Sequence, residues 1–176
     1  MKYLKTALIL AAICAVAAVV LAVLNSVTKP AIDAYELQKT KSALEAVAMG
    51  MEIGEKQEVS DNRYVTGMYP LYQDGKVSGY ILELSSTGYG GELGIVAGYD
   101  KAGFVIGARL VSDSETPGVG KKAENPSYMD KFIGVDVPTS KSMLSDADAA
   151  AVSGATMTFN GVSKALAAGS SYVKSL

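Results

Sequence analysis

Residues 153–158 read Ser-Gly-Ala-Thr-Met-Thr and concentrate side chains that could bind a ligand. Three hydroxyls and one glycine lie within these six residues, directly ahead of a predicted helix. Small residues let a ligand approach the backbone closely, and free amides at the start of a helix attract anions, typically phosphate. Taken alone, the segment fits a capping turn between two helices better than a phosphate site, because such turns also favour Ser, Thr and Gly.

A second segment, residues 115–120, reads Glu-Thr-Pro-Gly-Val-Gly and follows a predicted strand. Its proline fixes one backbone dihedral, and its two glycines permit tight turns. These residue types predict a rigid turn. Because Glu115 and Thr116 leave the end of a long strand, they could also reach a ligand held at residues 153–158.

The residues that are missing exclude several kinds of site. The sequence has no histidine, and its single cysteine, Cys14, lies inside the apolar run 7–24. There is therefore no Ser-His or Cys-His nucleophile pair, and no ligand set for haem or an iron–sulfur cluster outside the membrane. We expect no catalytic residue and no metal site, so any electron carrier would be organic. The net charge of −2, without blocks of like charge, argues against nucleic-acid binding.

Residues 7–24 form an uninterrupted apolar run of 18 residues. As a helix this run would be about 27 Å long, close to the roughly 30 Å thickness of a bilayer's hydrocarbon core. Lys2 and Lys5 precede it and favour a cytoplasmic N-terminus. We therefore divide the chain into an N-terminal transmembrane anchor, residues 1–28, and an extracytoplasmic domain, residues 29–176.

The alternative for this run is a cleaved signal peptide. The run exceeds the usual length of a signal-peptide core, and the small-x-small triplet Ala15-Val16-Ala17, which resembles a cleavage site, lies inside the run instead of after it. Both observations favour an uncleaved anchor.

The pattern after the anchor predicts an α+β fold, a mostly antiparallel sheet with helices before and after it. One helix is expected to begin after Pro30 and to end near Gly50. Asp74-Gly75 predicts a hairpin turn, residues 88–91 (Gly-Tyr-Gly-Gly) a break, and Asn160-Gly161 the start of a last helix. The predicted strands cover Tyr64–Tyr72, Val77–Leu84, Leu93–Tyr99 and Phe104–Val111, with short elements near Tyr128–Ile133 and Ser145–Asp148.

The order of these features carries a resemblance to a known family. The sequence resembles the FMN-binding domains of the G subunit of the Rnf complex and of the C subunit of the sodium-pumping quinone reductase. The resemblance covers nearly the whole chain: anchor, glycine break, Glu-Thr-Pro-Gly loop and Ser-Gly-Ala-Thr motif, in that order. Ala150, Phe159 and Val119 depart from the family's pattern, which usually has Asp, Ser and Leu there.

The resemblance implies a covalently bound FMN. In the family, the last Thr of the motif is esterified to the flavin's terminal phosphate by a flavin transferase that uses FAD. Carried over to this sequence, that residue is Thr156. Ser153, Gly154 and Ala155 complete the motif, and Thr158 matches the usual downstream threonine.

The resemblance also places the loop after the last strand against the flavin. Glu115 and Thr116 would hydrogen-bond the isoalloxazine or ribityl groups, and Val119 and Tyr89 would contact the ring. The redox chemistry itself belongs to the cofactor. The expected cofactor-binding residues outside the attachment motif are Glu115, Thr116, Pro117, Gly118, Val119 and Tyr89.

As a function, the resemblance implies an electron-transfer subunit of an Rnf-type ferredoxin:NAD oxidoreductase coupled to Na⁺ or H⁺ translocation. Such a subunit is not a catalyst alone. It would work with other membrane subunits of the complex, in the cytoplasmic membrane, with a single span and an extracytoplasmic domain. Three alternatives stay open: a stand-alone anchored flavoprotein, the C subunit of the quinone reductase, and an anchored binding module without redox chemistry.

Overall fold

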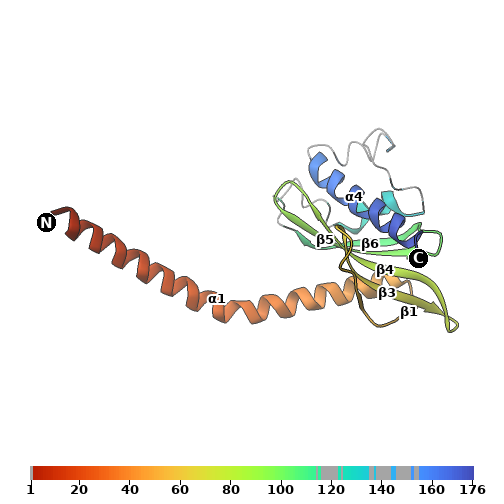
Figure 1. Cartoon of the computed structure of the whole chain (residues 1–176), viewed down its shortest axis with the longest axis horizontal. Coiled ribbons are helices and arrows are strands. Elements are labelled where there is room, and N and C mark those ends of the chain that lie inside the picture. The colour runs from red at the N-terminus through yellow and green to blue at the C-terminus, as the bar shows by residue number, and fades with distance from the viewer. Residues whose placement is uncertain are drawn as a thin grey trace. The chain divides into compact units, whose positions relative to one another are not determined.

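The computed structural model describes residues 2–113, 115, 123, 125–134, 137, 144–145, 152 and 155–176. The chain forms two compact parts, Met1–Gln38 and Lys39–Leu176. Figure 1 shows a single helix in the first part and a sheet with a long helix across it in the second.

Helix α1 (Lys2–Ala48) makes up the N-terminal part and ends within the second part. Among the described helices, it is the one that is long and apolar enough to cross a membrane. Its apolar side chains are exposed on every side, Leu10 to 62% and Leu21 to 66% of their surface. A helix that is apolar all round needs an apolar environment, so this arrangement fits a membrane segment.

The expectation that a new helix begins after Pro30 is wrong, because α1 continues through that residue. A proline inside a helix removes one hydrogen bond and costs about 3 kcal/mol, which predicts a break. Here the hydroxyls just before it bond back to their own helix: Ser26 Oγ donates to Val23 O (2.8 Å) and Thr28 Oγ1 to Leu24 O (2.9 Å). The end of the helix agrees with the prediction, because α1 ends at Ala48, just ahead of the expected stop at Gly50.

The second part contains one antiparallel sheet, as predicted. The strands lie in the order β1-β3-β4-β5-β6, and β2 pairs with β3 beside this path. The predicted hairpin turn at Asp74-Gly75 joins β3 to β4, and both residues have positive φ (52° and 72°), as a type I′ turn requires. The bounds are β1 (Glu52–Ile53), β2 (Gln57–Glu58), β3 (Val65–Gln73), β4 (Lys76–Thr87), β5 (Glu92–Asp100) and β6 (Val105–Asp113).

Helices cover both faces of the sheet. The last turns of α1 bury Ala43 and Val47 against one face, where they meet Ile81. Helix α4 (Thr156–Val173), with the short α2 (Pro126–Met129) and the 3-10 turn η2 (Asp130–Phe132), covers the other face. Because side chains alternate along a strand, Leu82 and Leu84 point towards α4 while Ile81 points away. The α+β class is therefore confirmed.

Helix α4 begins at Thr156 and not at Asn160-Gly161, which corrects the predicted start of the last helix. Asn-Gly is a common turn signal, but here the glycine serves packing. A Cβ on Gly161 would lie 2.6 Å from the backbone oxygen of Thr87 in β4, so only glycine lets helix and sheet approach this closely. Of the short element expected at 145–148, Ser145 lies in no helix, and Asp146 and Asp148 lie outside the described residues.

Candidate functional site

Three segments meet at one end of the sheet. Strand β4 ends there at Thr87, the glycine break 88–91 forms the turn into β5, and β6 ends there at Asp113. The amide of Gly88 donates to the carbonyl of Gly91 (2.8 Å), which closes the turn. The N-terminal half of α4 reaches the same end, because Gly161 lies against Thr87.

Glu115 holds this turn in place. The residue is only 3% exposed, and its Oε1 accepts hydrogen bonds from the backbone amides of Tyr89 (2.7 Å) and Gly90 (3.4 Å). The amide of Glu115 in turn donates to Oδ1 of Asp113 (2.9 Å). Hydrogen bonds to a carboxylate are stronger than neutral ones, so Glu115 fastens the β4–β5 turn to the end of β6.

The close fit of Glu115 requires a glycine at position 88. A Cβ on Gly88 would lie 1.9 Å from Oε1 of Glu115, far inside van der Waals contact. The glycine break therefore connects β4 to β5 and also leaves the space that the Glu115 carboxylate occupies. The side chain of Tyr89, between Gly88 and Gly90, is 71% exposed.

The N-terminus of α4 is the other half of the site. Its N-cap residue, Ala155, is buried and provides no side-chain cap, so the first helical amides have no capping partner from that side chain. Thr156 is the first helical residue and is exposed, as is Met157. Free amides and the helix dipole at such a terminus attract an anion, and the exposed hydroxyl of Thr156 stands beside them.

Two buried hydroxyls near this end, Thr158 Oγ1 and Tyr128 Oη, have no hydrogen-bond partner among the residues that the structure describes. Thr158 is only 1% exposed, so the two threonines of the motif face opposite environments. Burial, and to a smaller extent the nearby Glu115 carboxylate, raise the pKa of the Tyr128 phenol well above its usual range. Unpaired buried hydroxyls are costly in a folded protein, which makes both groups candidates for contact with a ligand or water.

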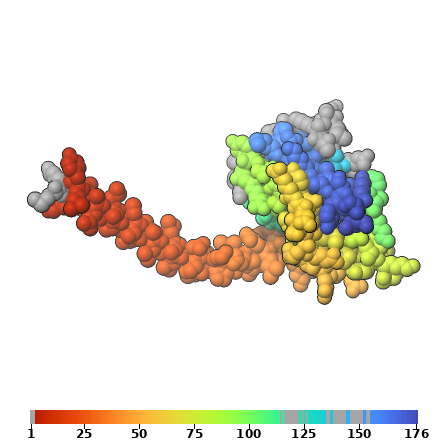
Figure 2. Space-filling model, viewed as in Figure 1, coloured from red at the N-terminus to blue at the C-terminus, as the bar shows by residue number. Residues whose placement is uncertain are grey.

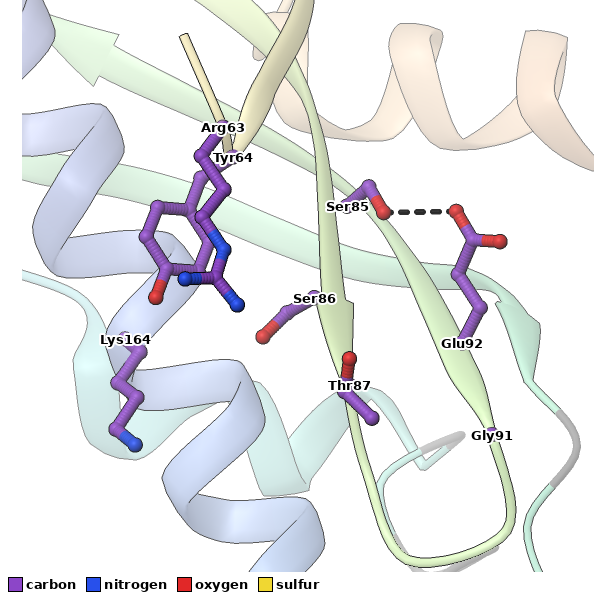
Figure 3. A pocket seen from close by; sticks show the side chains of 8 residues that line it. All are labelled: Arg63, Tyr64, Ser85, Ser86, Thr87, Gly91, Glu92 and Lys164. Atoms are coloured by element: carbon purple, nitrogen blue, oxygen red, sulfur yellow. Dashed lines mark hydrogen bonds between the residues drawn. The ribbon is translucent and has the colours of Figure 1, made fainter.

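A separate cavity of about 360 Å³ lies beside α4. It lies where the segment before β3, the end of β4 and the middle of α4 come together (Figure 3). Figure 2 shows that the segment before β3 and α4 run side by side on the surface here. The lining residues are Arg63, Tyr64, Ser85, Ser86, Thr87, Gly91, Glu92 and Lys164.

Two family models match the chain in sequence. The FMN-binding domain matches residues 88–170, and the RnfG N-terminal region matches residues 2–47. The first match begins at the Gly88 turn and includes both Glu115 and Thr156. The second ends one residue before the end of α1, so the two matches together cover most of the described structure.

Proteins of several organisms are similar to this chain in sequence. The chain is 32% identical over 143 residues to the G subunit of a Na(+)-translocating ferredoxin:NAD(+) oxidoreductase complex of Acetobacterium woodii, covering 74% of this chain and 69% of that protein. It is 27% identical over 175 residues to the G subunit of an ion-translocating oxidoreductase complex of Methanosarcina acetivorans, covering 96% and 93%. The chain belongs to the RnfG family. A shorter match, 34% identical over 74 residues, links it to the corresponding G subunit of Haemophilus influenzae and covers 40% and 36%.

Membership in the RnfG family indicates a role for each of the two parts of the chain. The second part contains an FMN-binding domain, which confirms the expected cofactor class. The exposed apolar helix of the first part, together with a family of ion-translocating complexes, makes this a membrane-anchored protein.

The structure brings several predicted site residues to one end of the sheet. Glu115 and Tyr89 meet in the turn, while Ala155, Thr156 and Thr158 lie at the start of α4. The predicted flavin contacts of Glu115 and Tyr89 stay predictions, and the one observed role of the Glu115 carboxylate is to hold the turn. The predicted residues that lie outside the described ranges are Ser153, Gly154, Thr116, Pro117, Gly118 and Val119.

Sequence reasoning did not find Tyr128, Arg63 or Lys164. Tyr128 lay within a predicted short element, but nothing in its neighbourhood signals that its hydroxyl is buried without a partner. Arg63 and Lys164 are far apart in the sequence, and only the packing of α4 on the sheet brings them to one cavity.

Proposed function

We propose that this chain is the electron-transfer subunit of an Rnf-type ferredoxin:NAD oxidoreductase complex and carries FMN esterified to Thr156. Membership in the RnfG family and the FMN-binding domain match support the role and the cofactor. The observation that carries the attachment point is the contrast at the start of α4, where the hydroxyl-bearing Thr156 is exposed and Thr158 is buried.

The residues at this terminus suit a phosphoester. A transferase must reach the hydroxyl that it modifies, and of the two threonines only Thr156 is accessible. Amides of the first helical turn can hold the phosphate oxygens, and the helix dipole favours their negative charge. The small Ala155 ahead of Thr156 leaves the approach open. Each of these features is a property of the chain itself.

Other residues would shape the surroundings of the cofactor. Glu115 fixes the Gly88 turn, and so fixes where the exposed ring of Tyr89 stands at the same end of the sheet. The hydroxyls of Thr158 and Tyr128, which find no partner among the described residues, would be satisfied by water or by polar atoms of the cofactor. When bound, the flavin supplies the redox chemistry, and the protein supplies attachment, orientation and electrostatics.

Attachment needs a partner enzyme, and we assign it to a flavin transferase that uses FAD. In that step the Thr156 Oγ–P bond forms, the P–O–P bond of FAD breaks, AMP leaves, and the hydroxyl proton is released. No electrons are exchanged. A covalent tether is useful outside the cytoplasm, where free FMN would be lost by dissociation. We propose that side for the soluble part because Lys2 and Lys5 precede the membrane helix.

The attachment is tested on the full chain purified from membranes of cells that contain an active flavin transferase. We expect an intact mass raised by FMN minus water, and yellow, fluorescent protein after denaturation and washing. Peptide mapping should place the added mass on the peptide that contains Thr156. Unmodified protein from such cells would contradict the proposal.

The matched variants are Thr156→Val and Thr158→Val. Both remove one hydroxyl from the same turn, but only the first removes the proposed attachment point. Thr156→Val should lose in-gel flavin fluorescence, and Thr158→Val should retain it. Equal loss in both variants would refute the assignment to Thr156.

A further inference from the structure

The cavity beside α4 is not used by the proposed attachment site and has its own chemistry. Two cationic side chains, Arg63 and Lys164, line it from the two walls, the segment before β3 and helix α4 (Figure 3). Neither forms an ion pair with another residue in the described part of the chain. Tyr64 and Ser86 also line the cavity, and their hydroxyls lie on the same side of β4 as the two cations (Figure 3).

The charge on this face is positive. Glu92, the one carboxylate among the lining residues, accepts a hydrogen bond from Ser85 Oγ (2.7 Å). Figure 3 shows this pair on the far side of β4, turned away from Arg63 and Lys164. Two cations that form no ion pair within the described residues, beside the hydroxyls of Tyr64 and Ser86, form a site for an anionic oxygen group, in a chain whose net charge is −2.

The walls of the cavity are held firmly. Asn62 Oδ1 accepts from the amides of Tyr64 (2.9 Å) and Val65 (3.1 Å), and the amide of Ser85 donates to the Tyr64 carbonyl (2.8 Å). The guanidinium of Arg63 lies over the Tyr64 ring, 5.7 Å from its centroid. A site whose donors are already in place loses less entropy when a partner binds.

The donors favour a carboxylate over a phosphate. Phosphate sites are commonly built from backbone amides in a turn or at a helix start. Here the strand at the floor of the cavity uses its backbone for sheet pairing, Ser85 with Gly94 and Ser86 with Leu93, so the free donors are side chains. Both cations are exposed, and an Arg stacked on a Tyr is typical of the residues enriched at protein interfaces.

We propose that this cavity receives carboxylate side chains from an acidic segment of a partner subunit of the complex. The inference rests on the proposed function, because it assumes that the chain works beside other subunits. Lys164 follows Thr156 by eight residues on the same helix, a rise of about 12 Å. A partner docked at Lys164 would therefore stand near the attachment point, where electrons must pass.

The test uses the full chain in its native membranes. The double variant Arg63→Glu/Lys164→Glu reverses both charges of the cavity. Its matched control, Lys76→Glu/Lys101→Glu, makes the same charge change at the opposite end of the sheet. The conservative variant Arg63→Lys/Lys164→Arg keeps both charges. The measurement is the amount of partner subunit that co-purifies with each tagged chain at low and at high salt.

We expect the cavity variant to retain at least tenfold less partner at low salt, and the difference to shrink at high salt because exposed charges are screened. The control and the conservative variant should stay within about twofold of the natural chain. In-gel flavin fluorescence should be unchanged in all of them. Unchanged partner retention in the cavity variant, with flavin present, overturns the inference.

Two further results separate this inference from its alternatives. Loss of flavin in the cavity variant alone would show that the cavity serves attachment, and would overturn partner docking. Protection of Lys164 from acylation by millimolar inorganic phosphate, in chain freed of partners, would identify a small-anion site instead. Absence of flavin from the natural chain would contradict the proposed function and is recorded independently in the same gel.

Discussion

The contact between Gly88 and Glu115 can be tested by a double-mutant cycle. Gly88→Ala would place a Cβ 1.9 Å from Glu115 Oε1, so the carboxylate must move away from the amide of Tyr89. A hydrogen bond to a charged group contributes about 1.5–3 kcal/mol, and Glu115→Ala removes the same bond outright. Each single variant should therefore lower the free energy of unfolding by about 2–3 kcal/mol.

The double variant should lose little more than Glu115→Ala alone. Once the carboxylate is gone, the nearest known neighbour of the new Cβ at position 88 is the end of the Leu93 side chain, 3.1 Å away, which can shift. The two effects should then fail to add by about 2 kcal/mol, well above the ~0.5 kcal/mol scatter of independent sites. The fold of the turn, and not the cofactor, sets this coupling.

The assay is urea unfolding of the full chain in detergent, followed by the near-ultraviolet circular dichroism of its tyrosines. The chain has 10 tyrosines and no tryptophan, so this signal reports on packing around the sheet. The control cycle pairs Gly88→Ala with Glu92→Ala, since Glu92 lies in the same hairpin but bonds Ser85. Additive losses in the Gly88–Glu115 cycle, or equal coupling in both cycles, would refute the reasoning.

Three further outcomes follow from the packing of α4 and from burial. Gly161→Ala should lower the free energy of unfolding by about 1–2 kcal/mol in the same urea assay. The new Cβ clashes with the Thr87 backbone oxygen at a cost of about 2–3 kcal/mol, which outweighs the ~1 kcal/mol gain in helix propensity. A stabilised variant would contradict this prediction. Thr158→Val should leave that free energy unchanged or raise it by about 1 kcal/mol, since it removes a buried hydroxyl that has no partner within the described part of the chain, and a clear loss would mean that the hydroxyl is bonded. Burial raises the pKa of three tyrosines in the folded chain. Their contribution to the free energy of unfolding is therefore complete below pH ~10, the pKa of a tyrosine in the unfolded chain, and is lost as the pH rises from there through the higher pKa of the folded chain. An alkaline titration followed by tyrosinate absorbance should therefore show that some tyrosines ionise only when the chain unfolds. Ionisation of all tyrosines in the folded chain would refute this prediction. The three tyrosines with a raised pKa are Tyr69, Tyr99 and Tyr128.

The fold could be predicted from the sequence wherever a local pattern had one meaning. Alternating apolar residues marked β4, and Asp74-Gly75 marked the hairpin because few other pairs accept positive φ at both positions. Pro30 and Gly161 misled the prediction. Each is a helix breaker by propensity, but α1 accepts the proline and α4 needs the glycine to approach β4.

The candidate site was only partly within reach of sequence reasoning. The resemblance to the FMN-binding family singled out Thr156 and Glu115, whereas the residue pattern alone predicted only a capping turn and a rigid turn at these positions. That Glu115 is buried against the Gly88 turn depends on contacts 25 and 26 residues away in the chain. The charged cavity of Arg63 and Lys164 depends on tertiary packing alone.

The start of α4 exposes Thr156 and buries Thr158. Successive residues of a helix turn by about 100°, so two threonines separated by one residue face nearly opposite directions. One residue inserted between Met157 and Thr158 would rotate Thr156 by about 100° around the helix axis relative to the buried helix face that contains Phe159. If FMN is attached as proposed, the rotation of the helix would select the acceptor, and a transferase would not need to distinguish the two side chains chemically.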